Sequence, residues 1–231
     1  MEIRNLIHYF FNGRVFLDTL PQLGQGLWVT VQIAFLSISM GFVLGLVLAV
    51  IRVAVKRITN VWPIRLLNLP IAFYVDVLRS IPPLITLVVV YYALPYLGIY
   101  LPRFWAAVLT FAVVLSAFAE EIFRAGIESI GRGQAEAARS LGLSYLQAMR
   151  HVVVPQGFRV AIPPLTSRTI AVTKDVSLAS VIGVADLLKE ARAAQAFLAN
   201  PTPLISAALL FTLVFLPLVR ISMYLERRLA K

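Results

Sequence analysis

The chain has 231 residues, of which 60% are hydrophobic, and its mean hydropathy is +0.85. This composition is too apolar for a soluble globular domain and indicates an integral membrane protein. Cysteine is absent, which excludes disulfides and thiolate metal sites, and the two histidines, His8 and His151, are too far apart for a ligand spacing. No GxxxxGK[ST] loop is present, so the chain does not bind ATP by that route.

The net charge of +10 comes from 21 Lys and Arg residues against 11 Asp and Glu residues. These cations lie mainly in loops between apolar segments, a pattern typical of membrane topology. We therefore interpret the positive charge as a topology signal and expect no nucleic-acid partner.

An amphipathic N-terminal segment, residues 1–20, precedes the first apolar stretch, and Ile3 to Leu20 is expected to lie as a helix at the membrane interface. It has no small-residue cleavage site and does not resemble a secretory peptide. An all-α membrane domain is then expected over residues 21–225, followed by a short tail, 226–231. About 20 residues suffice for one spanning helix, and five spans are expected, at Leu27 to Ile51, Leu66 to Tyr96, Trp105 to Ile122, Ala161 to Val184 and Pro203 to Tyr224.

Two of these spans carry local signals. In the first, small residues recur at four-residue intervals, which predicts a close helix-packing face; they are Ser37, Gly41, Gly45 and Ala49. In the second, Pro82-Pro83 predicts an interruption of the helix.

Between the third and fourth spans, residues 131–158 form a polar loop. Gln134 to Leu141 is rich in helix formers, and Gly142 is able to close that helix in the left-handed conformation. Ser144 and Gln147 have the spacing of a capping box that starts a second helix, which Pro155 is expected to end. The pattern predicts a helix–turn–helix with a fixed bend. An alanine-rich first helix has a thin profile that another protein's groove can approach, although an ordinary surface hairpin remains the simpler alternative on local features alone.

The distribution of cations predicts the orientation, because positively charged loops stay on the cytoplasmic side. The segments after the first, third and fifth spans share one side and hold most of the charge. The N-terminus is therefore expected outside, and the 131–158 loop and the C-terminus inside. The cations concerned are Arg52, Lys56, Arg57, Arg65, Arg132, Arg139, Arg150, Arg159, Arg227, Arg228 and Lys231.

The loop resembles the EAA loop of permease subunits from binding-protein-dependent ABC importers. Glu136-Ala137-Ala138 is followed by Gly142 after three residues and then by Val152, Val154 and Pro155, with valine at both aliphatic positions. Further segments are similar to the polar amino acid uptake branch, which includes histidine, glutamine and glutamate permeases. They are Gly26 to Thr30, Arg79 to Pro83, Tyr91 to Pro95, Glu121 to Ile127, Gly133-Gln134, Pro155-Gln156 and Lys174 to Leu178, with Val176 where many relatives carry threonine.

The resemblance implies a type I importer permease in a bacterial inner membrane that forms half of a translocation pathway with a second copy or close homologue. A cytoplasmic ABC ATPase dimer would bind below and a periplasmic amino-acid-binding protein above. The chain itself would be no enzyme and hold no cofactor, because its partner binds and hydrolyses ATP. Through the family, the ATPase-coupling residues would be Glu136, Ala137, Ala138 and Gly142.

Charged residues inside apolar spans are candidates for the pathway, because they are costly in lipid and usually face protein or water. Before the Pro82-Pro83 break, Arg79 and Ser80 lie beside Asp76. At the end of the third span, Glu120 and Arg124 have the spacing of a helix ion pair. Glu120, Glu121 and Arg124 together are also interpretable as a cluster of charges at the membrane interface. For Lys174 and Asp175 a pathway role and an interhelical role stay open. The candidate set is Arg79, Ser80, Glu121, Lys174, Asp175 and Ser177.

Two other function classes are weighed against this one. An ATP-independent channel or ion-coupled carrier would be supported by internal inverted repeats, and none is evident. A membrane-embedded enzyme would need a compact nucleophile or acid–base constellation, and Lys174-Asp175 has no evident partner. The sequence does not name the amino acid, although Arg79 and Lys174 favour an acidic or amide substrate over a cationic one.

Overall fold

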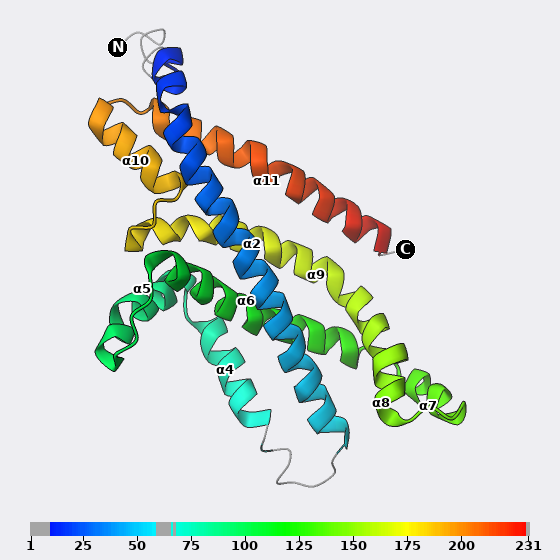
Figure 1. The fold of residues 1–231 in the computed structure, drawn as a ribbon. Coiled ribbons are helices and arrows are strands. Elements are labelled where there is room, and N and C mark those ends of the chain that lie inside the picture. Colours follow the sequence, from blue (N-terminus) through cyan, green and yellow to red (C-terminus); the bar gives the residue numbers. More distant parts are fainter. Residues whose placement is uncertain (1–9, 59–65, 67, 230–231) are drawn as a thin grey trace. The chain divides into compact units, whose positions relative to one another are not determined.

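The computed structural model describes residues 10–58, 66 and 68–229, and all regular elements within these ranges are helices (Figure 1). The predicted all-α fold is confirmed. The chain divides into two compact units, each of which is described by itself. Unit 1 comprises Met1–Ser37, Pro83–Phe111 and Val172–Arg220, and unit 2 comprises Ile38–Pro82, Ala112–Ala171 and Ile221–Lys231.

The first span lies within one long helix, α2 (Gly13–Ile58). The Asn12 side chain accepts hydrogen bonds from the backbone N–H groups of Arg14 (3.1 Å) and Val15 (3.3 Å) and so caps the helix at its N-terminus. Residues 13–20 of the expected interfacial helix, Ile3 to Leu20, are helical and continuous with the first span, because Pro21 does not end the helix. Their position at the membrane interface stays a prediction. Residues 1–9 lie outside the described residues.

The second span is broken where the two prolines predict it. Helix α4 (Asn68–Ser80) ends before them, and α5 (Pro83–Ala93) begins at the second and runs into the 3₁₀ turn η1 (Leu94–Leu97). Proline lacks the N–H group that would continue α4, whereas the first position of a new helix needs none.

Three helices are long and apolar enough to cross a membrane, or four if the broken pair is counted as one span. They are α2, α6 (Arg103–Glu128) and α11 (Thr202–Leu229). The expected fourth span corresponds to α9 (Val154–Asp175) and the 3₁₀ helix η3 (Val176–Ile182), whose charges and polar residues lower its hydropathy. The count of five spans stays a prediction.

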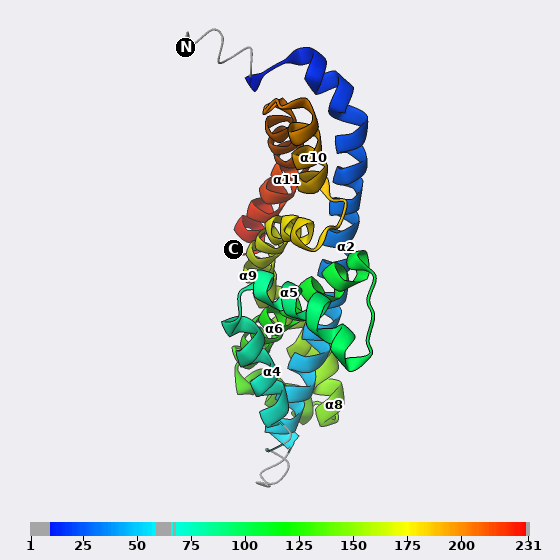
Figure 2. The ribbon, with the colours of Figure 1, turned by 90° about the vertical axis from the view of Figure 1, so that its left-hand side faces the viewer.

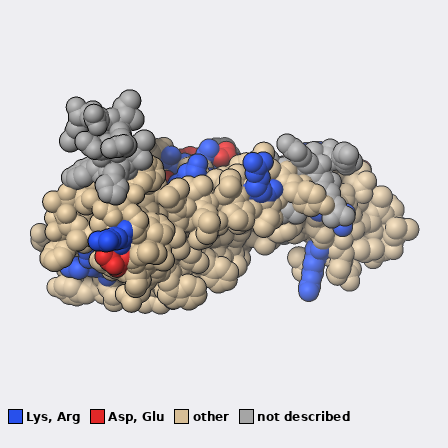
Figure 3. Space-filling model, turned by 90° about the horizontal axis from the view of Figure 1, so that it is seen from above, with Lys and Arg blue, Asp and Glu red and all other residues tan. Residues whose placement is uncertain are grey.

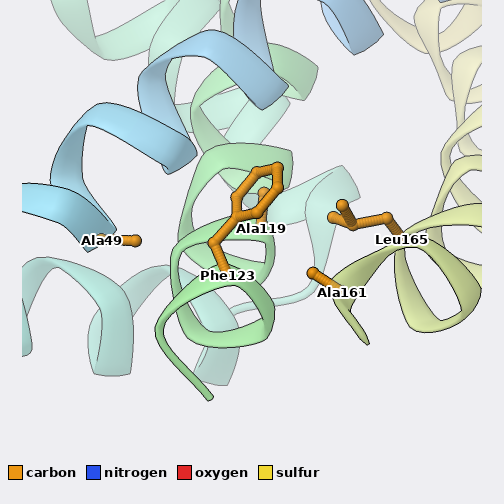
Figure 4. Close-up of a cluster of buried hydrophobic side chains, with 5 residues drawn as sticks. All are labelled: Ala49, Ala119, Phe123, Ala161 and Leu165. Atoms are coloured by element: carbon orange, nitrogen blue, oxygen red, sulfur yellow. The ribbon is translucent and has the colours of Figure 1, made fainter. Parts of the chain in front are cut away.

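In unit 2, α2, α6 and α9 approach one another so closely that glycine is required at the contacts. A Cβ added at Gly45 of α2 would lie 2.6 Å from the Cβ of Ala119, and one added at Gly126 of α6 would lie 2.5 Å from the carbonyl oxygen of Gly157 in α9. An apolar cluster lies beside these contacts (Figure 4); it comprises Ala49, Ala119, Phe123, Ala161 and Leu165.

The small-residue face predicted for the first span is confirmed. Ser37 is buried and donates a hydrogen bond to the carbonyl oxygen of Val108 (3.0 Å), and Gly41 would place a Cβ 2.9 Å from Leu115. This face packs against α6 of the same chain.

In unit 1, Gly183 has a positive φ of 81° and ends η3, after which Asp186 caps α10 (Leu187–Leu198). Helix α10 lies beside the N-terminal half of α2 (Figures 1 and 2). Leu23, Leu187, Ala191 and Ala207 form the core there. On the face shown in Figure 3, charged side chains gather in a few separate patches on a surface that is otherwise uncharged, as expected of a chain that lies in a bilayer.

Candidate coupling loop and pathway residues

The loop between α6 and α9 has the predicted bend. Helix α7 (Arg132–Ser140) ends before Gly142, which has a φ of +89°. Ser144 and Gln147 then form the predicted capping box, with N–O distances of 2.8 and 3.3 Å, and α8 (Tyr145–Ala148) follows. The helix–turn–helix is thus specified by short-range patterns, and the structure confirms them.

Pro155 does not end the second helix, contrary to expectation. A π-helical turn, η2 (Met149–Val153), joins α8 to α9, which begins at Val154 and continues through Pro155. In a regular α-helix Pro155 would leave the carbonyl of His151 without its donor. That carbonyl lies within the π turn, where the hydrogen-bond pattern is already shifted by one residue, so proline is accommodated there.

The surface of the loop is mixed in chemistry. Glu136, Ala137 and Gly142 are exposed, and Leu141 and Leu146 are 83% and 73% exposed on this otherwise polar loop. A surface groove of about 570 Å³ runs along it, lined by Glu136, Arg139, Ser140, Gly142, Leu143, Ser144, Tyr145 and Gln147. Exposed leucines beside such a groove are apolar surface of the kind that protein–protein contacts bury.

Ala138 departs from the expected thin exposed profile, because it is only 6% exposed and packs within this chain. The loop is anchored below by an apolar cluster of Val53, Ile127, Met149 and Val153, against which Ala135 and Tyr145 pack. Movement of the loop would therefore act directly on the ends of α2 and α6, which this cluster contacts.

Three of the predicted pathway residues lie in unit 2. Arg79 of α4 forms an ion pair with Glu121 of α6. The Arg79 guanidinium also lies 5.4 Å from the centre of the Phe118 ring, and that of Arg168 lies 3.4 Å from it, a cation–π distance. Ser80 donates its hydroxyl proton to the carbonyl of Asp76 in its own helix (2.7 Å).

Sequence reasoning did not find Phe118 and Arg168 as partners. Arg168 carried a signal, since a cation in an apolar segment needs a partner. Its partner, however, is aromatic and about 50 residues away in the chain.

Glu120 lies between arginines from two helices. It is fully buried, and its carboxylate oxygens lie 3.2 and 3.3 Å from Arg52 of α2 and, on α6, 3.3 Å from Arg124. The predicted pairing of Glu120 with Arg124 is confirmed, and Arg124 also contacts Glu128 (3.2 Å). The contact with Arg52 was missed, because the positive-inside pattern assigned Arg52 to a solvated loop.

The other three candidates belong to unit 1. Lys174 is exposed and Asp175 is half-buried at the end of α9. Ser177 donates a hydrogen bond to the Lys174 carbonyl (2.8 Å). Val176 is fully buried, so the methyl group that replaces a hydroxyl at this position packs against protein. Within the described part of the chain, no group of three or more His, Asp or Glu residues is placed to hold a metal ion.

Comparison with known proteins decides the family. Residues 41–231 match the family described as binding-protein-dependent transport system inner membrane component. The chain belongs to this family. It is therefore a multi-pass inner-membrane permease subunit of an ABC importer, as the sequence analysis expected, and partners of the ATPase and binding-protein kinds accompany such subunits.

Individual relatives cover nearly the whole chain. It is 36% identical to the arginine transport system permease protein of Bacillus subtilis strain 168 over 220 residues, which is 93% of this chain and 96% of that one. It is 34% identical to the probable glutamine ABC transporter permease protein of the same organism, over 95% and 99% of the two chains. In the crystal structure of an amino acid ABC transporter with histidines, a chain 33% identical to this one superposes with a TM-score of 0.78, over 92% of this chain and 96% of that one.

Proposed function

We propose that this permease carries a polar amino acid through a pathway that it forms with a second copy of itself or a close homologue. A separate cytoplasmic ATPase dimer hydrolyses the ATP, and a periplasmic amino-acid-binding protein delivers the substrate. The observation that carries the proposal is the 131–158 loop, an exposed helix–turn–helix anchored on the ends of α2 and α6. The arginine and glutamine permeases among its relatives support an amino acid as the substrate.

Gly142→Val tests the coupling role of the loop. Valine at a φ of +89° is strained whatever the free space, by about 1 kcal/mol or more, so the bend between α7 and α8 shifts. We expect membrane insertion to survive, uptake to fall, and ATPase activity to lose its response to the loaded binding protein. Gly98→Val is a matched control, because Gly98 has a φ of +79° and equally open surroundings but lies after η1, outside the coupling loop. Equal responses of the two variants would contradict the coupling role.

Orientation belongs to the same proposal. We propose that the N-terminal segment, residues 1–20, lies on the periplasmic side, that the permease domain covers 21–225, and that the tail 226–231 is cytoplasmic. Because the chain has no cysteine, single cysteines report without background. We expect Asn12→Cys to react with an impermeant maleimide on intact cells and Gly133→Cys to react only after permeabilisation. The reverse pattern would place the loop away from the ATPase.

We further propose that the membrane charges line the pathway. In unit 2, Arg79, Ser80 and Glu121 offer a cation, a hydroxyl and an anion, which complement the carboxylate and ammonium groups of an amino acid. In unit 1, Lys174, Asp175 and Ser177 offer the same three groups. Exposure of either set of side chains to hydrocarbon costs free energy, whereas contact with water or substrate stabilises their charges.

A further inference from the structure

Glu120 is the one fully buried carboxylate that the described part of unit 2 contains. It joins two helices, because Arg52 comes from α2 and Arg124 from α6 itself. Arg124 also pairs with Glu128 on α6 (3.2 Å). The pair of Glu120 with Arg52 ties α2 to α6.

The ion pair lies next to the closest approach of these two helices. A Cβ at Gly45 would lie 2.6 Å from the Ala119 Cβ and 3.0 Å from the backbone nitrogen of Glu120. The contact between Gly45 and Ala119 sets how closely α2 and α6 approach, and it includes no directional bond. A charge-assisted hydrogen bond is directional and fixes one register.

The coupling loop packs against the same two helices, α2 and α6. Val53 directly follows Arg52, and Ile127 lies about two turns beyond Glu120; both pack on Met149 and Val153. On the next residue of α6, Glu121 holds Arg79 of α4. The Arg52–Glu120 pair is thus adjacent in sequence both to Val53, which contacts the loop, and to Glu121, which is proposed to line the pathway.

We propose that Glu120 is a positioning residue for coupling, which locks the register of α2 on α6 so that displacement of the loop moves both helices together. This inference rests on the proposed function. Buried ion pairs stabilise little compared with apolar packing, and register is their best-attested contribution.

The test measures amino acid transported per ATP hydrolysed, with the permease reconstituted in liposomes together with its ATPase and binding protein. Arginine, glutamine and cystine serve as radiolabelled probes. Both quantities are normalised to assembled complex, so a lower yield does not affect the ratio. We expect Glu120→Gln to lower the ratio at least about fivefold. Asp18→Asn is the control, because it removes an exposed carboxylate from α2 and leaves the Arg52–Glu120 pair intact, and it should stay within about twofold of the wild type.

A second variant distinguishes a role of Glu120 in fixing the register of α2 on α6 from a role in stabilising the fold. Arg52→Met with Glu120→Met removes both charges of the interhelical pair, leaves Arg124 its pair with Glu128, and introduces two flexible apolar side chains. We expect this double variant to assemble like the wild type and still transport poorly per ATP. Wild-type ratios in Glu120→Gln or in the double variant, or an equal loss in Asp18→Asn, would overturn the inference. A wild-type complex that moves none of the three probes, nor any other amino acid, would contradict the proposed function instead.

Discussion

Glu120 in unit 2 and Asp186 in unit 1 are both fully buried carboxylates, and they are stabilised in different ways. Glu120 has two guanidinium groups within 3.3 Å. Asp186 accepts a hydrogen bond from the backbone N–H of Lys189 (2.8 Å) and caps α10, while the Lys189 ammonium donates to the carbonyl of Gly183. Arg192 affects Asp186 only at longer range.

Glu120 and Asp186 therefore have different effects on the structure. Glu120 pairs with Arg52 on another helix as well as with Arg124 on its own, so it fixes where α2 lies on α6. The carboxylate of Asp186 accepts from the Lys189 N–H in the first turn of α10, so it fixes where α10 begins. The close contact of Gly26 with the Asp186 carbonyl oxygen brings that turn against α2. One carboxylate arranges helices and the other arranges a turn.

Removing Glu120 altogether should have the largest effect. In Glu120→Leu both Arg52 and Arg124 face an apolar side chain, and breaking a buried pair from one side costs about 3–5 kcal/mol. We expect the yield of assembled complex and its melting temperature to fall sharply in size-exclusion and thermal-shift assays. Leu213→Ala provides the contrast, because Leu213 of α11 is 71% exposed and its truncation should change little. If both variants behaved alike, Glu120 would not be a link between helices.

The sequence predicts features that depend on residues close together in the chain, and it does not predict contacts between distant residues. The bend at Gly142 and the capping box at Ser144 depend on neighbours within four residues, and both were predicted correctly. The small-residue face of α2 is periodic and was also predicted. The contact of Arg52 with Glu120 joins residues far apart in the chain, and its charges have several possible partners in sequence. Pro155 was misjudged because the π turn that accommodates it leaves no simple sequence pattern.

Exposed charge should behave differently from buried charge, and Lys174 tests this. Lys174 is exposed in unit 1, so its loss leaves no buried partner in an apolar site. We expect Lys174→Met to abolish amino acid uptake while assembly and basal ATPase activity persist, because methionine fills similar space. A fall in complex yield, restored by Asp175→Asn, would instead assign Lys174 a structural role like that of Glu120. Wild-type uptake would remove it from the pathway.

Asp186 should give the smallest effect and the clearest dependence on pH. Burial raises the pKa of Asp186 to about 6, from an ordinary value near 4. The folded state therefore binds this proton more readily than the unfolded state, and the free energy of unfolding falls as pH rises from about 4 to about 6. The decline that this group contributes is at most about 3 kcal/mol and is complete above its folded pKa.

Asp186→Asn separates the charge from the cap. Asparagine keeps a side-chain oxygen that accepts from the Lys189 N–H, and it has no proton to lose in this range. We expect the variant to match the wild type near pH 4.5 and to melt at a higher temperature near pH 7, because ionisation no longer places a charge in a buried turn. Thermal-shift curves of the purified complex across this range measure the difference directly, since other titrating groups contribute equally to both proteins. Parallel curves would show that Asp186 does not change its protonation state between pH 4.5 and pH 7 in the folded protein.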